Sequence, residues 1–323
     1  MLHHWLELDC EKEIEKICTT LCESLTRFKR RGYVLGISGG IDSSVTLALC
    51  VKAVGVPRVL TLQMPERHSA HETDALGDLL AQKFNVANVS EPITPVLDAL
   101  GFYKRYDDTV RKVIPEYETG WTSKIVTSNV LEKKGITFFS VVARSPSGEI
   151  IKKRLPAKEY LEIIAATNFK QRTRKMLEYY HADRLNYAVA GTPNRLEYDQ
   201  GFFVKLGDGS ADVKPIAHLY KTQVYALAEH LDIPEQIRKR PPTTDTYSMP
   251  QGQDEFFFSL PYNQMDICLF GKNHGRSTND TAEAAGLTTQ QVEAVYRDID
   301  TKRSTTSYLH ARPVLTEHIR EVG

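Results

Sequence analysis

Two glycines, a carboxylate and three hydroxyls stand together at residues 38–44, in the sequence Ser-Gly-Gly-Ile-Asp-Ser-Ser. The apolar run before them, residues 33–37, predicts a buried strand, and the apolar positions after Ser43 predict a helix. Glycine lets the backbone pass close to a ligand, and the free N–H groups at a helix start attract anions. Asp42 adds a carboxylate of the kind that binds Mg²⁺. The segment therefore predicts a turn that binds phosphate groups together with a metal ion.

The spacing of this turn differs from that of the two commoner nucleotide-binding loops. Neither Gly-x₄-Gly-Lys-Ser/Thr nor Gly-x-Gly-x-x-Gly occurs in it. The pattern Ser-Gly-Gly-x-Asp-Ser instead resembles the pyrophosphate loop of the N-type ATP pyrophosphatases, which split ATP between its α- and β-phosphates. The resemblance implies a loop that holds the leaving pyrophosphate.

A second polar segment, residues 191–212, begins where a predicted buried strand, residues 186–190, ends. Such a density of polar groups and glycines after a strand predicts a ligand site. The segment supplies five candidate side chains: Thr192, Glu197, Lys205, Asp208 and Asp212.

The elements that must position these residues alternate along the chain. Hydrophobic spacing predicts helices at 9–31, 69–84 and 219–231, and strands at 33–37, 58–64, 86–89 and 186–190. Such alternation predicts an α/β fold with a doubly wound parallel sheet, in which ligands bind at the carboxyl ends of the strands. The apolar stripe of the first helix is expected to pack inside its own domain or across a two-fold axis.

The region from about 103 to 167 interrupts this alternation. Residues 136–143 and 150–155, joined by Ser-Pro-Ser-Gly at 145–148, predict a β-hairpin. We interpret the region as an insertion in a single domain that spans residues 1–323, with the hairpin covering a dimer seam or the substrate mouth. A loop is expected over residues 238–254, which show little apolar periodicity.

Composition narrows the functional classes. The 323 residues contain 41 lysines and arginines and 41 aspartates and glutamates, so no net charge favours nucleic acid. No apolar run is long enough to span a membrane, and no secretory signal precedes the first helix. Five cysteines without a Cys-x-x-Cys pair suit a reducing compartment, so a cytoplasmic protein is expected.

Taken in order, the segments resemble the NAD synthetase family. The resemblance covers residues 33–102 and 168–303, and its most specific parts are the loop at 38–43, Gly-Thr-x₄-Glu at 191–197, and Lys-x-Gly-Asp-Gly-x-Ala-Asp at 205–212 followed by Pro-x₅-Lys at 215–221. It implies an adenine nucleotide alpha hydrolase-like fold and the ATP-dependent amidation of deamido-NAD to NAD. A carboxylate is a poor electrophile, so it would first be adenylated with release of pyrophosphate, and ammonia would then displace AMP.

The resemblance also implies a role for each matched residue. It places ATP at Ser38, Gly39, Gly40, Asp42, Ser43, Ser44, Thr192, Lys221 and Thr243, and Mg²⁺ at Asp42 and Glu197. It places deamido-NAD at Arg172, Lys205, Asp212 and Lys302, the last without the histidine that often precedes it in the family. Asp42 and Lys221 would act at the reacting phosphate, and Asp208 would orient or deprotonate the incoming amine.

Alternatives remain at this stage. The nearest alternative is an amide synthetase of the same fold that adenylates another carboxylate. This alternative stays open because the insertion leads into Arg172, an expected substrate residue. A tRNA-modifying pyrophosphatase is disfavoured by the zero net charge, and a non-catalytic nucleotide-binding module by the presence of both Asp42 and Glu197. The family likeness implies a homodimer. With no glutaminase portion expected in a chain of this length, ammonia would come free or from a separate glutaminase.

Overall fold

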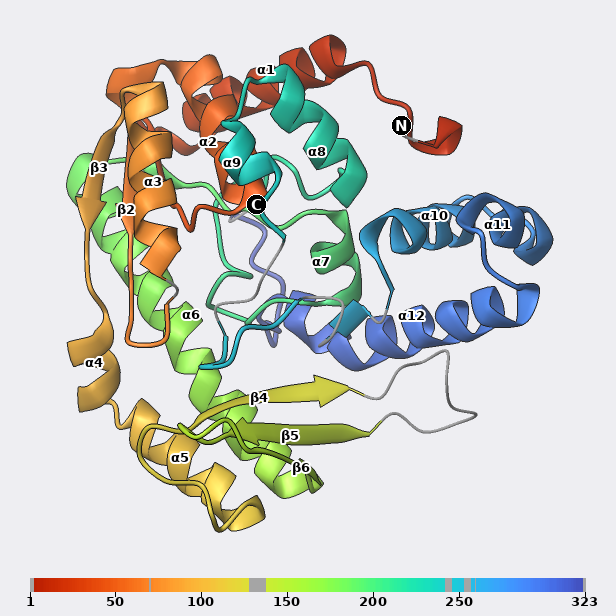
Figure 1. Ribbon diagram of the computed structural model, residues 1–323. Coiled ribbons are helices and arrows are strands. Elements are labelled where there is room, and N and C mark those ends of the chain that lie inside the picture. Colours follow the sequence, from red (N-terminus) through yellow and green to blue (C-terminus); the bar gives the residue numbers. More distant parts are fainter. Residues whose placement is uncertain are drawn as a thin grey trace.

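The computed structural model describes residues 3–69, 71–127, 138–241, 246–252, 257–258 and 260–321 (Figure 1). Its strands are β1 (Tyr33–Gly36), β2 (Val59–Gln63), β3 (Ala87–Ser90), β4 (Thr122–Thr127), β5 (Phe139–Arg144), β6 (Ile150–Arg154) and β7 (Ala188–Val189). Its α-helices are α1 (Cys10–Phe28), α2 (Ile41–Val54), α3 (His71–Phe84), α4 (Thr94–Ala99), α5 (Phe102–Val113), α6 (Ala157–Leu185), α7 (Arg195–Gln200), α8 (Lys221–His230), α9 (Glu235–Arg238), α10 (Tyr262–Asn273), α11 (Thr278–Ala285) and α12 (Thr289–His310). Two short 3₁₀ turns, η1 (His4–Leu6) and η2 (Val56–Arg58), are also present.

A parallel sheet with strand order β3-β2-β1-β7 forms the centre of the fold. Its side chains alternate between two buried faces, as strand geometry requires. Tyr33 and Leu35 of β1 pack with α1, α2 and α8, whereas Val34 between them packs with α5 and α6. The predicted α/β architecture, its four parallel strands and the helices at 9–31, 69–84 and 219–231 are therefore confirmed.

The apolar stripe of α1 packs inside its own chain. Ile14, Ile17, Leu21 and Leu25 are buried in the cluster that also contains residues of α2 and α8. The intramolecular alternative is the one that the structure adopts, so this stripe is not a free surface for a second subunit.

The inserted region forms a second sheet with strand order β4-β5-β6. The predicted hairpin is present as β5 and β6, which pair antiparallel, with Gly148 at positive φ in the turn between them. Residues 136 and 137 lie outside the described residues. The sequence analysis missed β4, which pairs with β5 and receives the segment 248–251 along its other edge.

A long helix, α6, joins the two sheets (Figure 1). It begins at Ala157, after β6, and continues to Leu185, before β7. The expected limits of the insertion, 103 and 167, fall inside α5 and α6. Ile125 and Val141 of the second sheet share one buried cluster with Val34 and Leu62 of the parallel sheet, so the insertion has no core of its own.

Helices α10, α11 and α12 form a third layer beside α7 and α8 (Figure 1). The N-terminal turn is anchored between them: Leu6 is buried in their cluster, the Leu6 carbonyl accepts a hydrogen bond from Gln223 of α8, and Trp5 stacks on Phe270 of α10. None of the helices among the described residues is long and apolar enough to cross a membrane.

Candidate active site

The turn at residues 38–44 connects β1 to α2, and no side chain of the described residues caps the start of α2. Gly39 has φ +63°, and a Cβ there would lie 2.7 Å from Cβ of Leu76, so only glycine fits. Gly40 is the N-cap of α2 and has no side-chain cap hydrogen bond. The hydroxyls of Ser43 and Ser44 both donate to the Gly40 carbonyl, at 3.0 and 2.8 Å. The N–H groups at the start of α2 are thus presented at the carboxyl edge of the sheet, where they suit an anion.

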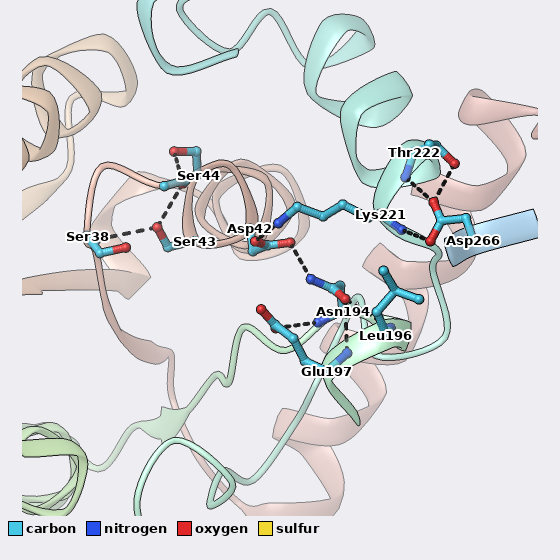
Figure 2. A network of polar contacts seen from close by, with 11 residues as sticks. Ser38, Asp42, Ser43, Ser44, Asn194, Leu196, Glu197, Lys221, Thr222 and Asp266 are labelled. Carbon is cyan, nitrogen blue, oxygen red and sulfur yellow. Dashed lines mark hydrogen bonds and ion pairs between the residues drawn. The ribbon is translucent and has the colours of Figure 1, made fainter. Parts of the chain in front are cut away.

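Four side chains from three elements meet next to this turn (Figure 2). Asp42 of α2 forms an ion pair with Lys221, the first residue of α8, and accepts a hydrogen bond of 3.1 Å from Asn194 Nδ2. The Asn194 side chain also caps α7 by accepting from the backbone N–H of Glu197, whose carboxylate accepts from Asn194 N in return. This capping box fixes Glu197 relative to Asp42 through one amide side chain.

Lys221 is 1% exposed, yet it remains charged. Burial alone would lower its pKa, but the charges of Asp42 and Glu197 outweigh this effect, so the pKa of Lys221 is raised. The side chain therefore places a fixed positive charge at the turn, where phosphate charge would develop.

The position of Lys221 depends on a residue that the sequence analysis missed. Asp266 of α10 is completely buried and caps the start of α8: its carboxylate accepts from Lys221 N at 3.2 Å and from both N and Oγ1 of Thr222 at 2.7 Å (Figure 2). Burial raises the pKa of Asp266 to about 6, while the N–H and hydroxyl donors oppose the shift. The signal in the sequence was only a carboxylate in an apolar run.

A cavity of about 730 Å³ opens above the turn and collects most of the predicted site residues. Its lining includes Ser38, Gly40, Asp42, Ser43, Arg172, Thr192, Glu197, Lys205, Asp208 and Lys221. Gly39 and Ser44 belong to the turn but do not line the cavity. Thr243 lies outside the described residues.

Two residues expected to hold the second substrate have other partners. The Asp212 carboxylate accepts from Val189 N at 2.7 Å and so extends the edge of the parallel sheet. The Lys302 ammonium donates to the Phe257 carbonyl and to Asp298 at 2.5 and 2.6 Å. Neither Asp212 nor Lys302 lines the cavity, although Phe257 does.

Three other predicted residues form one wall of the cavity. Arg172 Nε donates to the Lys205 carbonyl at 3.3 Å, and the Lys205 ammonium donates to the carbonyls of Tyr308 and Ala311 at 2.8 and 3.0 Å. Asp208 accepts from Val204 N at 2.7 Å. Desolvation raises the pKa of Asp208, while its backbone hydrogen bonds oppose this shift.

Two buried ion pairs on α6 also escaped the sequence analysis. Lys170 contacts Glu66 at 2.7 Å and the Thr246 carbonyl at 3.0 Å, while Glu66 accepts from Tyr103 of α5. Lys175 contacts Glu178 at 2.5 Å. Because the partners of Lys170 are distant in sequence, only the tertiary fold reveals that pair.

Asp42 and Glu197 make a donor set that suits Mg²⁺. Both line the cavity beside the turn, and Asn194 holds them together. Two carboxylates suffice for Mg²⁺, which takes one or two of them and completes its octahedral shell with substrate phosphates and water.

The parallel sheet has a Gly-Gly-Ile-Asp turn at the end of a central strand, and this turn faces a second carboxylate and a buried lysine. These features define an α/β protein of the N-type ATP pyrophosphatase class. Within that class, the sequence model of NAD synthase matches residues 13–117 and 111–306, and the chain belongs to this family. The family expected from the motifs is confirmed.

Relatives support this assignment over nearly the whole chain. The chain is 56% identical, over 317 residues, to the NH(3)-dependent NAD(+) synthetase of Rhizobium meliloti (strain 1021), with 98% of this chain and 95% of the relative covered. It is 36% identical over 270 residues to the Thermotoga maritima protein of the same name, covering 82% and 89% of the two chains.

Solved structures confirm the fold. NMN synthetase from Francisella tularensis superimposes with a TM-score of 0.67 at 19% identity, over 97% of this chain and all of the other. The NH3-dependent NAD synthetase of Campylobacter jejuni, in complex with the nitrate ion, gives 0.62 at 22% identity, over 96% and 100%.

Proposed function

We propose that this protein amidates deamido-NAD to NAD with ATP and ammonia, through an acyl-adenylate and with release of AMP and pyrophosphate. The observation that carries the proposal is the Lys221–Asp42–Asn194–Glu197 network at the turn, in a chain 56% identical to an NH(3)-dependent NAD(+) synthetase. The network supplies what adenylation needs: a positive charge and two metal-binding carboxylates beside the phosphates.

The residues that line the cavity have different roles in the proposed reaction. The N–H groups at the start of α2, with Ser38 and Ser43, bind the ATP phosphates, and Thr192 lines the same part of the cavity. Lys221 stabilises charge that accumulates on the leaving pyrophosphate. Asp42 and Glu197 hold Mg²⁺, which when bound offsets phosphate charge. Arg172 and Lys205 bind the anionic dinucleotide, and Asp208, with its raised pKa, orients ammonia or takes up a proton from it.

We also propose that the protein is a homodimer. Helix α6 exposes three large apolar side chains on one face, Leu161, Met176 and Tyr180, at 64, 57 and 59% exposure. Arg172 is exposed on the same face, so a second subunit docked there would lie beside the substrate. Light scattering checks this: a mass of one chain at micromolar concentration would contradict the dimer.

The whole chain is proposed to be one domain, because the inserted sheet shares its core with the parallel sheet. A cytoplasmic location is proposed from the five free cysteines. Ammonia is taken from solution or from a separate glutaminase.

The decisive experiment incubates purified protein with Mg-ATP, ammonium chloride and deamido-NAD, and measures NAD and AMP. Equal amounts of NAD and AMP are expected. The alternative, amidation of another carboxylate, is tested by nicotinic acid mononucleotide in place of deamido-NAD, since the fold is shared with an NMN synthetase. A higher kcat/KM for the mononucleotide would make that alternative correct.

A further inference from the structure

Helix α6 follows the cavity along much of its length. Its lining residues run from Tyr160 to Glu178, eighteen positions that correspond to about 27 Å of helix at 1.5 Å per residue. At one end, Glu178 Oε1 lies 2.9 Å from where a Cβ on Gly36 would be, so this end adjoins β1 and the phosphate-binding turn. At the other end, Tyr160 lies against the inserted sheet. The cavity thus connects the turn to the insertion.

The chemistry of the lining changes in order along this helix. Tyr160 and Ile164 come first, followed by the neutral polar side chains of Thr167, Asn168 and Gln171. Lys170, between them, also lines the cavity but is buried in its ion pair with Glu66. Arg172 and Arg174 follow nearer the turn, with Lys175, which is paired with Glu178. An aromatic surface, then hydrogen-bonding groups, then positive charge is the order that a base, a ribose and a diphosphate require.

The apolar end is built jointly by α6 and the insertion. The rings of Phe139, the first residue of β5, and Tyr160 are stacked at 4.2 Å between centroids, with an interplanar angle of 18°. Both residues line the cavity and are only half-buried, so part of this aromatic surface faces the cavity space. Stacking on an aromatic side chain is the sequence-independent way in which proteins hold a nucleic acid base.

The direction of the substrate follows from the reaction. The carboxylate of deamido-NAD must reach the α-phosphorus of ATP, so its nicotinate end lies at the turn and its adenosine end points away. Tyr225, Ile237 and Arg240, on the α8–α9 side, line the same cavity as α6. We assign the adenosine of ATP to the α8–α9 side and the second substrate to the α6 side.

We propose that Phe139 and Tyr160 form the subsite for the adenine ring of the dinucleotide substrate, and that the insertion selects a dinucleotide over a mononucleotide. This inference rests on the proposed function and adds a role for the insertion. Phe139 and Tyr160 bind the distal base and take no part in the chemical step, so they act on substrate affinity.

The test compares two carboxylates that share the reacting end. In Tyr160→Leu and Phe139→Leu, kcat/KM for deamido-NAD should fall about 10-fold, mainly through KM, as expected for loss of base stacking. With nicotinic acid mononucleotide, which lacks the adenosine, kcat/KM should stay within about two-fold, and so should the KM for ATP. Tyr160→Phe keeps the ring and should resemble the wild type.

The outcomes separate the two proposals. If the wild type makes no NAD from deamido-NAD, the proposed function fails, and the subsite fails with it. If the wild type is active but the leucine variants lose activity equally with both carboxylates, or lose ATP affinity, the ring pair is structural and the subsite is overturned. Should the mononucleotide not be turned over, calorimetric Kd values for the two carboxylates give the same ratio, and an unchanged ratio contradicts the subsite.

Discussion

The two halves of the cavity are built in different ways. On the side of the phosphate-binding turn, the key side chains stand at helix starts: Asp42 in the first turn of α2, Asn194 at the N-cap of α7 and Lys221 at the first position of α8. On the side of α6 and the insertion, charged side chains such as Lys170 stand in the middle of a long helix. Residues distant in sequence meet in both halves: Lys221 is 179 positions from Asp42, and Lys170 is 104 positions from Glu66. The halves therefore differ in whether a helix start positions the side chain.

The largest effect is expected at the turn. Asp42→Ala should lower AMP formation roughly 1,000-fold, because one metal-binding carboxylate is lost. It should also lower the free energy of unfolding by about 3–5 kcal/mol, since Lys221 is left buried without this counter-charge. Adding Lys221→Met should restore most of the stability and none of the activity. AMP release and urea unfolding measure the two effects.

Glu197→Ala provides the matched control for this pair. It should lose activity to a similar degree, yet cost only about 1 kcal/mol of stability, the value of one capping contact. Full activity in either alanine variant would remove the proposed metal site, and unchanged stability in Asp42→Ala would show that the lysine does not depend on this ion pair.

The buried ion pair on the other side should act mainly on stability. Lys170→Met leaves the Glu66 carboxylate buried. Burial raises the pKa of this carboxyl, and Lys170, with smaller contributions from His68 and Tyr103, lowers it below the usual value. A loss of about 3–5 kcal/mol in unfolding free energy is expected. Lys112→Met, which breaks a largely exposed pair with Glu162 between α5 and α6, should cost less than about 1 kcal/mol. Equal losses would contradict the distinction.

Variants of Arg172 and Lys205 test whether the α6 side of the cavity binds deamido-NAD and not ATP. Alanine at either position should lower kcat/KM for deamido-NAD by roughly 30- to 1,000-fold, about 2–4 kcal/mol, with little change in the KM for ATP. Asp212→Asn should reduce thermal stability and leave the KM for deamido-NAD close to that of the wild type, because its carboxylate contacts Val189 N. Steady-state kinetics with each substrate varied separately decide this, and a raised KM in Asp212→Asn would support the substrate role that the family likeness implies for this residue.

A further expected effect, smaller than those at Asp42 and Lys170, is a pH dependence of stability from Asp266. Its pKa is about 6 in the folded protein against an ordinary 3.8, so the folded state holds this proton more tightly than the unfolded chain. The group's contribution to stability is therefore greatest below pH 4 and is lost as the pH rises through 6. The stability of the wild type relative to Asp266→Asn should fall by about 1–3 kcal/mol over this interval. Urea unfolding from pH 4 to 7 measures it, and a constant difference would contradict the assignment.

The sequence predicted the half of the cavity at the phosphate-binding turn better than the half at α6 and the insertion. The turn, Thr192, Glu197 and Lys221 are tied to strand and helix ends, and local patterns locate such ends. Helix α6 was not predicted as one element because it packs against α5 as well as against β1 and β7, which weakens its amphipathic spacing. Strand β4 was also missed. Asp266 and Lys170 have partners 44 or more positions away, which no local spacing reveals. The substrate roles of Asp212 and Lys302 came from the family likeness and remain predictions, because in the structure their side chains bond to backbone or neighbouring groups.

The N-terminal turn has a consequence for the order in which the protein is made. The Leu6 carbonyl bonds to Gln223, 217 positions later, and Trp5 stacks on Phe270. At about 5–20 residues per second, Leu6 waits roughly 10 to 40 s for the synthesis of Gln223. Asp266, which fixes the start of α8, is synthesised later still. The phosphate-binding turn is therefore synthesised early, whereas the residue that fixes Lys221 is synthesised much later, so the ATP site is finished only when translation has passed α10.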